Sequence, residues 1–84
     1  MNRIIFSRHA RQQMAERGAS QGEVIETITK GEGIPVRHGR VMYRKNFQYN
    51  HKWGNKFYHI KQVMPIVKKE GNNIIVITVY TFYF

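Results

Sequence analysis

A change in hydrophobic periodicity near Gly33 is the sequence feature that most constrains the fold of this chain. Before Gly33, apolar residues recur at the three- and four-residue spacing of amphipathic helices, and after it the spacing shifts towards the two residues typical of strands. Two helices are predicted, at about residues 7–17 and 20–30. The remainder is predicted to form strands, so the expected class is α+β with N-terminal helices.

Local signals mark the ends of both predicted helices. Ser7 and Ser20 precede them, and a serine in that position can accept a hydrogen bond from an unpaired helix N–H. Glu23 completes a capping box with Ser20. Gly18 is predicted to end the first helix in the left-handed conformation, and Gly31 to end the second.

The rest of the chain predicts a three- to four-stranded, mainly antiparallel sheet with both helices on one face. Residues 46–56 are predicted to form a loop or a frayed hairpin. Residues 57–67 form a strand that Pro65 confines to an edge or a bulge. Residues 74–84 are apolar on both faces, which is typical of a central strand covered on each side.

The charge balance indicates a polyanionic partner, of which nucleic acid is the commonest. The 84 residues form one small domain, residues 1–84, with 14 Lys and Arg against five acidic residues and a net charge of +9. All five acidic residues are glutamates, and there is no cysteine. Disulfide scaffolds, thiol catalysis and cysteine-based zinc sites are therefore excluded, and a two-metal nuclease is disfavoured because such sites need clustered carboxylates.

Other cofactors and compartments find no support in the sequence. The four histidines lack the spacing of a metal site, so no metal is expected, and no phosphate-binding glycine motif or other cofactor signature is present. The first residues do not form a signal peptide, and residues 74–84 are too short to cross a bilayer. A cytoplasmic protein without membrane contact is expected.

The chemistry that remains is metal-free and relies on His, Arg, Lys, Tyr and Thr. This set suits RNA cleavage by the substrate's own 2′-hydroxyl, because the protein then has only to position the nucleophile, move protons and stabilise charge on phosphorus. A histidine can act as general acid or base near neutral pH, and an arginine can bind phosphate oxygens.

Two segments resemble a family of short bacterial proteins described as a domain of unknown function. The first is FSRHARQQMAERG at residues 6–18, and the second is IVITVY at residues 75–80. The resemblance implies a fold similar to the RelE/ParE-like toxins and the wider barnase–EndoU–colicin–RelE group of metal-independent ribonucleases. Gln13 departs from the pattern, because a basic residue is frequent there, and so does Ala19, which replaces a β-branched aliphatic residue.

The family's marked residues fall on His9, Arg17, Thr78 and Tyr80. The resemblance implies that His9 is a general acid or base, that Arg17 clamps phosphate, and that Thr78 and Tyr80 orient the substrate. Structural explanations stand beside these roles. A cation such as Arg17 is favourable in the last turn of any helix, and threonine and tyrosine are common strand residues.

Basic and aromatic residues are interleaved in the second half of the chain, which offers phosphate contacts and base-stacking surfaces together. The residues expected to bind RNA are Arg11, Arg40, Arg44, Lys45, Lys52, Lys56 and Lys61. The sequence thus predicts a toxin-like RNA-binding domain, with metal-independent cleavage of mRNA or tRNA as its candidate activity and an acidic antitoxin-like protein as a candidate partner.

Two alternatives stay open at this point. One is a non-catalytic nucleic-acid-binding module, and the other is a protein-interaction module whose basic face docks an acidic partner. Exposed aromatic side chains in residues 46–56 would favour base stacking, and buried ones would favour docking or a structural role. A monomer or a weak homodimer is expected, since the apolar residues 82–84 offer a surface for association.

Overall fold

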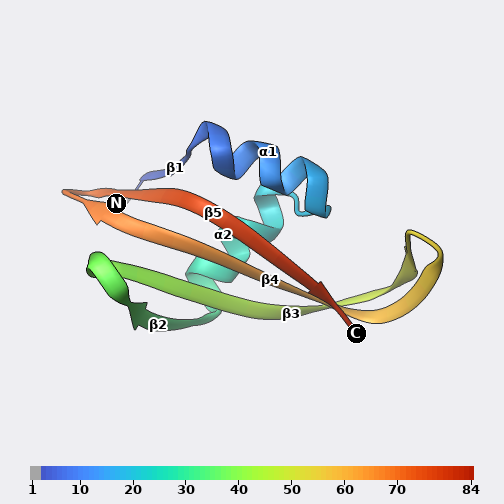
Figure 1. Ribbon diagram of the computed structural model, residues 1–84. Helices are drawn as coiled ribbons and strands as arrows, with labels where there is room; N and C mark the ends of the chain where they lie inside the picture. The colour runs from blue at the N-terminus through green and yellow to red at the C-terminus, as the bar shows by residue number, and fades with distance from the viewer. Residues whose placement is uncertain (1–2) are drawn as a thin grey trace.

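Five strands form a single sheet in the order β1-β5-β4-β3-β2 in the computed structural model, which describes residues 3–84 (Figure 1). The strands are β1 (Arg3–Phe6), β2 (Glu32–Val36), β3 (Arg40–Trp53), β4 (Lys56–Glu70) and β5 (Asn73–Tyr83). The helices are α1 (Arg8–Arg17), α2 (Gln21–Lys30) and a short 3₁₀ helix, η1 (Arg37–Gly39).

The predicted α+β class with two N-terminal helices is confirmed, but the sheet has five strands in place of the predicted three to four. The additional strands are short and lie at the two edges of the sheet. β1 pairs with β5 in parallel, and all other neighbours are antiparallel, so the sheet is mixed.

The predicted helix ends are confirmed. The Ser7 hydroxyl accepts a hydrogen bond from the backbone N–H of Ala10 at 3.0 Å. Ser20 and Glu23 form both hydrogen bonds of the capping box. Gly18 ends α1 with a φ of 77°, a conformation that glycine adopts at little cost.

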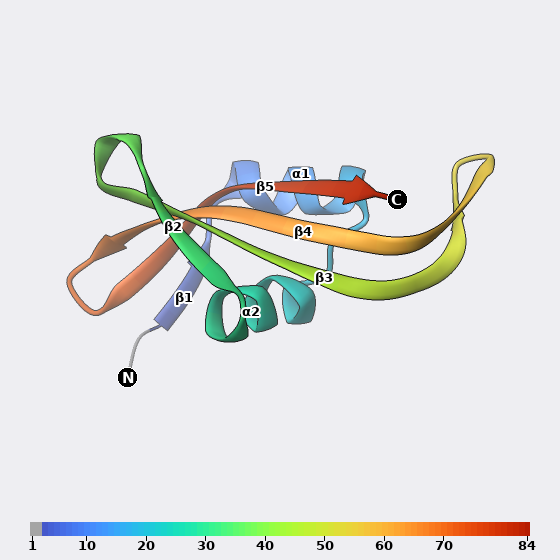
Figure 2. The same cartoon turned by 90° about the horizontal axis from the view of Figure 1, so that it is seen from below.

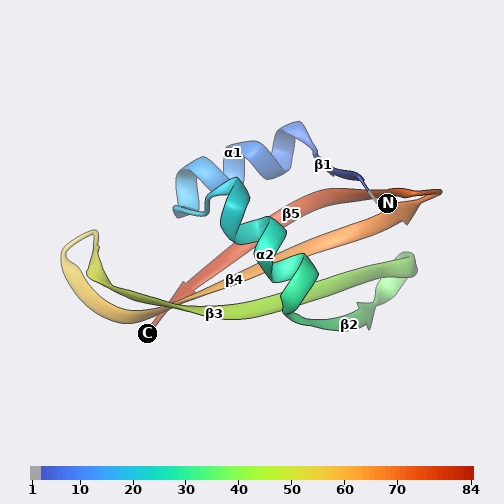
Figure 3. The same cartoon turned by 180° about the vertical axis from the view of Figure 1, so that it is seen from behind.

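Both helices lie against one face of the sheet, which we call the helix face (Figure 3). The core forms between the helices and the central strands, because the strand residues on this face are small and β-branched. Its buried apolar residues are Ala10, Met14, Ala19, Val24, Ile28, Val63, Val67, Ile74, Val76 and Val79.

The opposite face of the sheet, which we call the open face, has no covering element among residues 3–84. Tyr80 and Phe82 on this face are 39% and 43% exposed. The prediction that residues 74–84 are covered on each side is therefore wrong. These residues are apolar on both faces of β5, but only the helix face is covered, and the helix that covers it is α1.

Residues 46–56 form a hairpin, which is the second of the two predicted alternatives, and its strands are paired to the turn. β3 and β4 continue to Trp53 and Lys56, and a turn at residues 54–55 joins them. The end of this hairpin extends past β5 and curls (Figures 1 and 2). Since no third strand supports its tip, the alternation of buried and exposed residues that identifies a strand is weak there.

Pro65 lies in β4, between β5 and β3, so an edge position is wrong. The β3–β4 ladder is interrupted at Pro65, which has no N–H to donate. The predicted alternative, a bulge, does not fall on Pro65 either, because Pro65 pairs regularly with Val79. The nearest register shift between β4 and β5 lies between Ile66 and Val67, where β5 has one extra residue, Ile77.

Candidate nucleic-acid interface

Side chains of α1 take the place of a neighbouring strand along the outer edge of β5. β1 pairs only with the first part of β5. Beyond it, the Ser7 hydroxyl donates to the carbonyl oxygen of Ile77 at 3.2 Å. The Gln13 side-chain oxygen accepts from the N–H of Val79 at 3.2 Å, and Arg17 Nη1 donates to the carbonyl oxygen of Val79 at 2.7 Å. These bonds hold α1 against β5 and occupy backbone groups that an edge strand leaves unpaired.

Three of the four predicted catalytic residues meet at this junction. The Arg17 guanidinium carbon lies 5.0 Å from the centre of the Tyr80 ring. The Thr78 hydroxyl donates to the side-chain oxygen of Gln13. Thr78 and Tyr80 pair with alternate residues of β4 and lie on the open face, as their two-residue spacing predicts. Arg17 and Tyr80 thus form one exposed cationic and aromatic unit.

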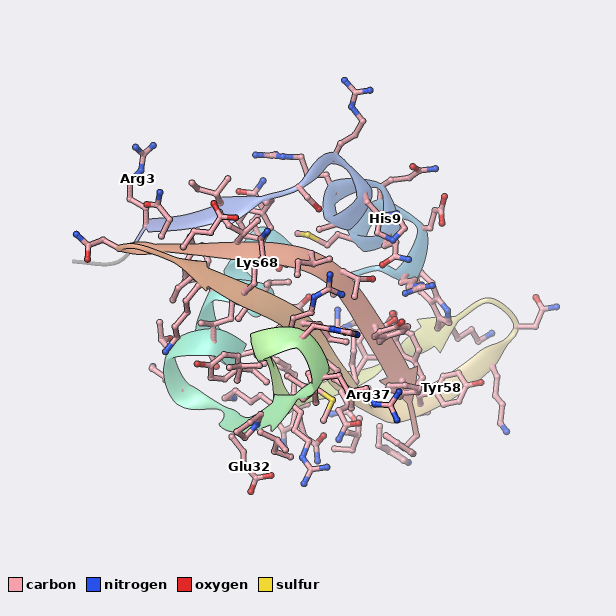
Figure 4. The ribbon with its side chains drawn as sticks, turned by 60° about the vertical axis from the view of Figure 1, so that its left-hand side comes forward. Arg3, His9, Glu32, Arg37, Tyr58 and Lys68 are labelled. Atoms are coloured by element: carbon pink, nitrogen blue, oxygen red, sulfur yellow. The ribbon has the colours of Figure 1, made fainter. Side chains whose placement is uncertain are left out.

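His9 lies on α1 one turn before Gln13 and is exposed (Figure 4). Among residues 3–84 it makes no hydrogen bond or ion pair with Arg17, Thr78 or Tyr80. The structure therefore groups these three residues and leaves His9 as a separate side chain on the same helix.

The strand register arranges the open-face side chains in rows across the sheet. From the β1 end, the first row is Ile5, Ile75, Lys68, Arg40 and Val36, and the second is Thr78, Ile66, Met42 and Ile34. The third contains Tyr80, Met64, Arg44 and Glu32, the fourth Phe82, Gln62 and Asn46, and the fifth Phe84, Ile60 and Gln48. The face is thus aliphatic towards the first rows and aromatic and polar towards the last.

Two cations stand directly opposite each other in the first row. Arg40 pairs with Lys68 across the antiparallel β3–β4 ladder. Lys68 also forms an exposed ion pair with Glu70 at 2.8 Å, whereas Arg40 has no carboxylate partner among residues 3–84. Like charges directly opposite one another destabilise a sheet, so a bound anion here would relieve their repulsion.

Few of the basic residues are neutralised within the protein. Four of the five glutamates each form one ion pair, so ten of the 14 Lys and Arg have no carboxylate partner among residues 3–84. On the open face, Arg44 donates two hydrogen bonds to Glu32, at 2.7 and 3.1 Å, and both side chains are exposed. An exposed pair of this kind can exchange its carboxylate for a phosphate at little cost.

The other residues expected to bind RNA lie away from the open face. Arg11 lies on α1 with its guanidinium carbon 5.7 Å from the Phe6 ring, and Lys52 and Lys56 lie on the exposed hairpin. Lys45 faces the helices and pairs with Glu26 at 3.0 Å. The hydrogen bond from Lys45 lowers the pKa of the Glu26 carboxyl.

Lys61 is buried, in contrast to the surface position that the sequence analysis gave it. It is 6% exposed, and its ammonium contacts the carbonyl oxygen of Gly18 at 2.8 Å and the two carboxylate oxygens of Glu23 at 2.9 and 2.8 Å. Glu23 is also the capping-box residue of α2. Lys61 therefore ties β4 to the α1–α2 junction and is unavailable to a ligand.

An aromatic cluster centred on Tyr83 covers the α1–α2 junction. The ring centres of Tyr49, Trp53 and Tyr58 lie 5.3, 4.9 and 5.7 Å from that of Tyr83, and Trp53 stacks nearly parallel to it. A Cβ atom at Gly18 would lie 2.7 Å from the Trp53 ring, so only glycine leaves room for it. The packing of these aromatic residues against one another and against Gly18 therefore contributes to the stability of the fold.

Burial raises the pKa of the Tyr83 hydroxyl, which donates a hydrogen bond to the carbonyl oxygen of Arg17 at 2.7 Å. The aromatic residues of 46–56 are used within the fold, since Tyr49 and Trp53 contact Tyr83 and Phe47 packs against the core. This use favours a structural or docking role for them over base stacking, although Trp53 keeps 38% exposure.

Among residues 3–84, no three histidines or carboxylates gather in a way that could hold a metal ion, and no pocket forms. No helix in this range has the length and hydropathy needed to cross a membrane.

The structure defines a small α+β domain with two helices on one face of a mixed sheet and a basic, partly aromatic surface on the other. The chain belongs to the family described as Domain of unknown function (DUF4258), whose model matches residues 6–81. Comparison with curated proteins and with solved structures gives no match.

Proposed function

We propose that this protein is an RNA-binding domain whose open sheet face contacts the phosphate backbone. The observation that carries the proposal is the uncovered face with Arg40 directly opposite Lys68 and no carboxylate beside Arg40 among residues 3–84. Arg17 and Arg44 add cations further along the same face. RNA is favoured over other polyanions because aromatic and amide side chains lie on the same face, in the row of Arg44 and in the rows beyond it, and a sheet surface of that composition suits unpaired bases.

Salt dependence tests the electrostatic part of the proposal. Each phosphate contact to a single strand contributes about −0.7 to the slope of log K against log salt. The double variant Arg40→Gln with Lys68→Gln should bind labelled RNA roughly tenfold more weakly at low salt and reduce the slope by about 1.4. Fluorescence anisotropy over a salt series gives both values.

A charge-matched control keeps the test specific to the open face. Lys30→Gln with Lys69→Gln removes two exposed cations at the end of α2 and on the other side of β4. This variant should retain most of the affinity and the slope. Equal losses in the two double variants would show diffuse attraction to net charge and would contradict binding at the open face.

RNA cleavage is the second candidate function, and the observation that favours it is the Arg17–Tyr80 contact beside Thr78. In the reaction, the 2′-oxygen bonds to the adjacent phosphorus, the bond from phosphorus to the 5′-oxygen breaks, and a 2′,3′-cyclic phosphate and a 5′-hydroxyl result. A base accepts the 2′-hydroxyl proton and an acid protonates the leaving 5′-oxygen, so no co-reactant is needed. His9 is the candidate proton carrier, and Arg17 would stabilise the charge on phosphorus.

Incubation of labelled structured RNA with the protein in EDTA separates binding from cleavage. Cleavage that His9→Ala abolishes, with the fold and RNA affinity unchanged, would support the catalytic role. Intact RNA with a salt-sensitive mobility shift would contradict cleavage and support binding alone. Intact RNA without a shift at moderate salt would contradict both functions and would favour an acidic protein as the partner.

A further inference from the structure

Three aromatic side chains form a strip on the open face, two from β5 and that of Phe84, which follows β5 and pairs with Ile60. Tyr80, Phe82 and Phe84 occupy alternate positions, and Phe84, the most exposed, is 63% accessible. None of the three stacks on another aromatic ring among residues 3–84, in contrast to the cluster around Tyr83. Packing within the domain therefore does not account for the presence of three exposed aromatic rings at these positions.

The spacing of the strip selects the form of nucleic acid that can use it. Alternate residues of a strand are about 7 Å apart, whereas successive bases of a duplex stack in direct contact, about 3.4 Å apart in the B-form and no further apart in the A-form that RNA adopts. Successive bases of an intact duplex therefore cannot each stack on successive rings of this strip. An unpaired strand can, because its bases separate and turn independently.

Amide side chains lie beside the strip, on the next two strands. The Gln62 side-chain nitrogen donates a hydrogen bond to the Asn46 side-chain oxygen at 3.0 Å, and both belong to the row of Phe82. Gln48 lies in the row of Phe84. Amides offer donors and acceptors together, which match the hydrogen-bonding edges of unpaired bases.

Arg17 supplies a phosphate or base contact at the start of the strip. One of its five N–H donors is used by the carbonyl oxygen of Val79, and its guanidinium lies over Tyr80. The bond to Val79 fixes the guanidinium beside the first ring of the strip. Its other N–H groups make no hydrogen bond among residues 3–84.

We propose that the open face binds an unpaired RNA segment of about three nucleotides, with one base stacked on each of Tyr80, Phe82 and Phe84 and with the amides of Asn46, Gln48 and Gln62 contacting the base edges. This inference rests on the proposed RNA-binding function and assigns its ligand. The cations at the far end of the face would hold the backbone that continues beyond these nucleotides.

The test uses a labelled RNA of about twelve nucleotides that cannot pair with itself, alone and annealed to its complement. The wild-type protein should bind the single strand at least about tenfold more tightly than the duplex. Phe82→Ala should weaken single-strand binding about tenfold, because one base loses its stacking surface, and Phe82→Tyr should restore it. Phe57→Ala removes an equally exposed ring from the hairpin and should leave affinity unchanged.

Equal affinity for the two RNAs, or a Phe82→Ala protein that binds like the wild type, would overturn the stacking assignment. If the Arg40→Gln/Lys68→Gln effect persists in that case, RNA binding itself stands. Absence of binding to either RNA would overturn both proposals. Circular dichroism and the fluorescence of the single tryptophan, Trp53, verify that each variant is folded.

Discussion

The two faces of the sheet are built by alternate residues of the same strands, yet their side chains differ in kind. On the helix face, Val63, Val67, Val76 and Val79 are fully buried against α1 and α2. On the open face, the apolar residues are larger and accessible, and cations and amides stand between them. The comparison indicates that the helix face determines stability, whereas the open face can vary in chemistry without loss of the fold.

The two faces also differ in their ion pairs, because the pair between Lys61 and Glu23 on the helix face is largely buried and those on the open face are exposed. Breaking the buried pair should give the largest loss of stability. Lys61→Ala removes a buried cation from Glu23 and from the carbonyl oxygen of Gly18, and should lower the free energy of unfolding by about 3 kcal/mol. Arg44→Ala breaks an exposed pair on the open face and should cost less than about 1 kcal/mol. Urea denaturation of both variants measures the difference, and similar losses would remove the distinction between the faces.

Adjacent residues of β4 provide a second comparison, because they point to opposite faces. Val63→Ala leaves a cavity in the core and should destabilise the protein by roughly 2 kcal/mol. Met64→Ala on the open face should cost well under half of that, because its side chain is only partly buried. Thermal or urea unfolding tests both, and a larger loss for Met64→Ala would indicate that the open face is covered in solution.

Alanine variants of two glycines with positive φ distinguish the cost of backbone strain from the cost of lost packing, because only one of the two glycines is in contact with other side chains. Gly18→Ala should cost about 2 kcal/mol and alter Trp53 fluorescence, because the new methyl group meets the Trp53 ring and the Tyr83 hydroxyl. Gly39→Ala, at a φ of 69° in open space, should cost only about 1 kcal/mol from the backbone conformation. Equal costs would mean that Trp53 does not pack on Gly18.

The smallest effect concerns pH. Burial raises the pKa of Tyr83 in the folded protein, so the unfolded chain loses this proton first as the pH rises. The contribution of Tyr83 to stability is therefore constant at neutral pH and falls above about pH 10. The difference in unfolding free energy between wild type and Tyr83→Phe should stay constant up to about pH 9 and shrink above about pH 10. A difference that stays constant would contradict the buried hydroxyl.

Helix boundaries could be predicted because their causes are local. The hydroxyls of Ser7 and Ser20 bond to backbone groups three residues away, and Gly18 ends α1 through its own φ. The strand β1 could not be found in this way, because its pairing partner lies almost the whole chain away. Its three apolar residues carry no periodicity of their own.

The burial of Lys61 has a signal in the sequence. In a strand with a two-residue period, Lys61 shares its face with Val63 and Val67, which predicts burial. Only the tertiary structure identifies Glu23 as its partner, because the two residues are 38 positions apart in the sequence, with β2, η1 and β3 between them. One cation among fourteen cannot be singled out from composition.

The features of the candidate site that depend on neighbouring residues in the sequence could be predicted. The two-residue spacing of Thr78 and Tyr80 places them on one face, and the resemblance drew attention to Arg17. The Arg17–Tyr80 contact depends on how α1 lies along β5, and this arrangement is set by Gln13 and by the caps of the helix. Hydropathy could not show that one side of β5 is open, because an exposed aromatic strip and a buried strand have the same apolar composition.

The parallel pairing of β1 with β5 has a consequence for how the protein is made. Residues 3–6 are synthesised 70 residues before their partners, residues 73–76, since Arg3 pairs with Asn73. Both helices and the strands β2, β3 and β4 are therefore made while the position of β5 between β1 and β4 is still empty. Because a loop of nearly that length must close before β1 can pair, this contact is expected late in folding. Translation that stops before residue 73 would leave a chain without β5, whose α1 exposes the surface that packs on β5, and such a chain is a substrate for chaperones and proteases.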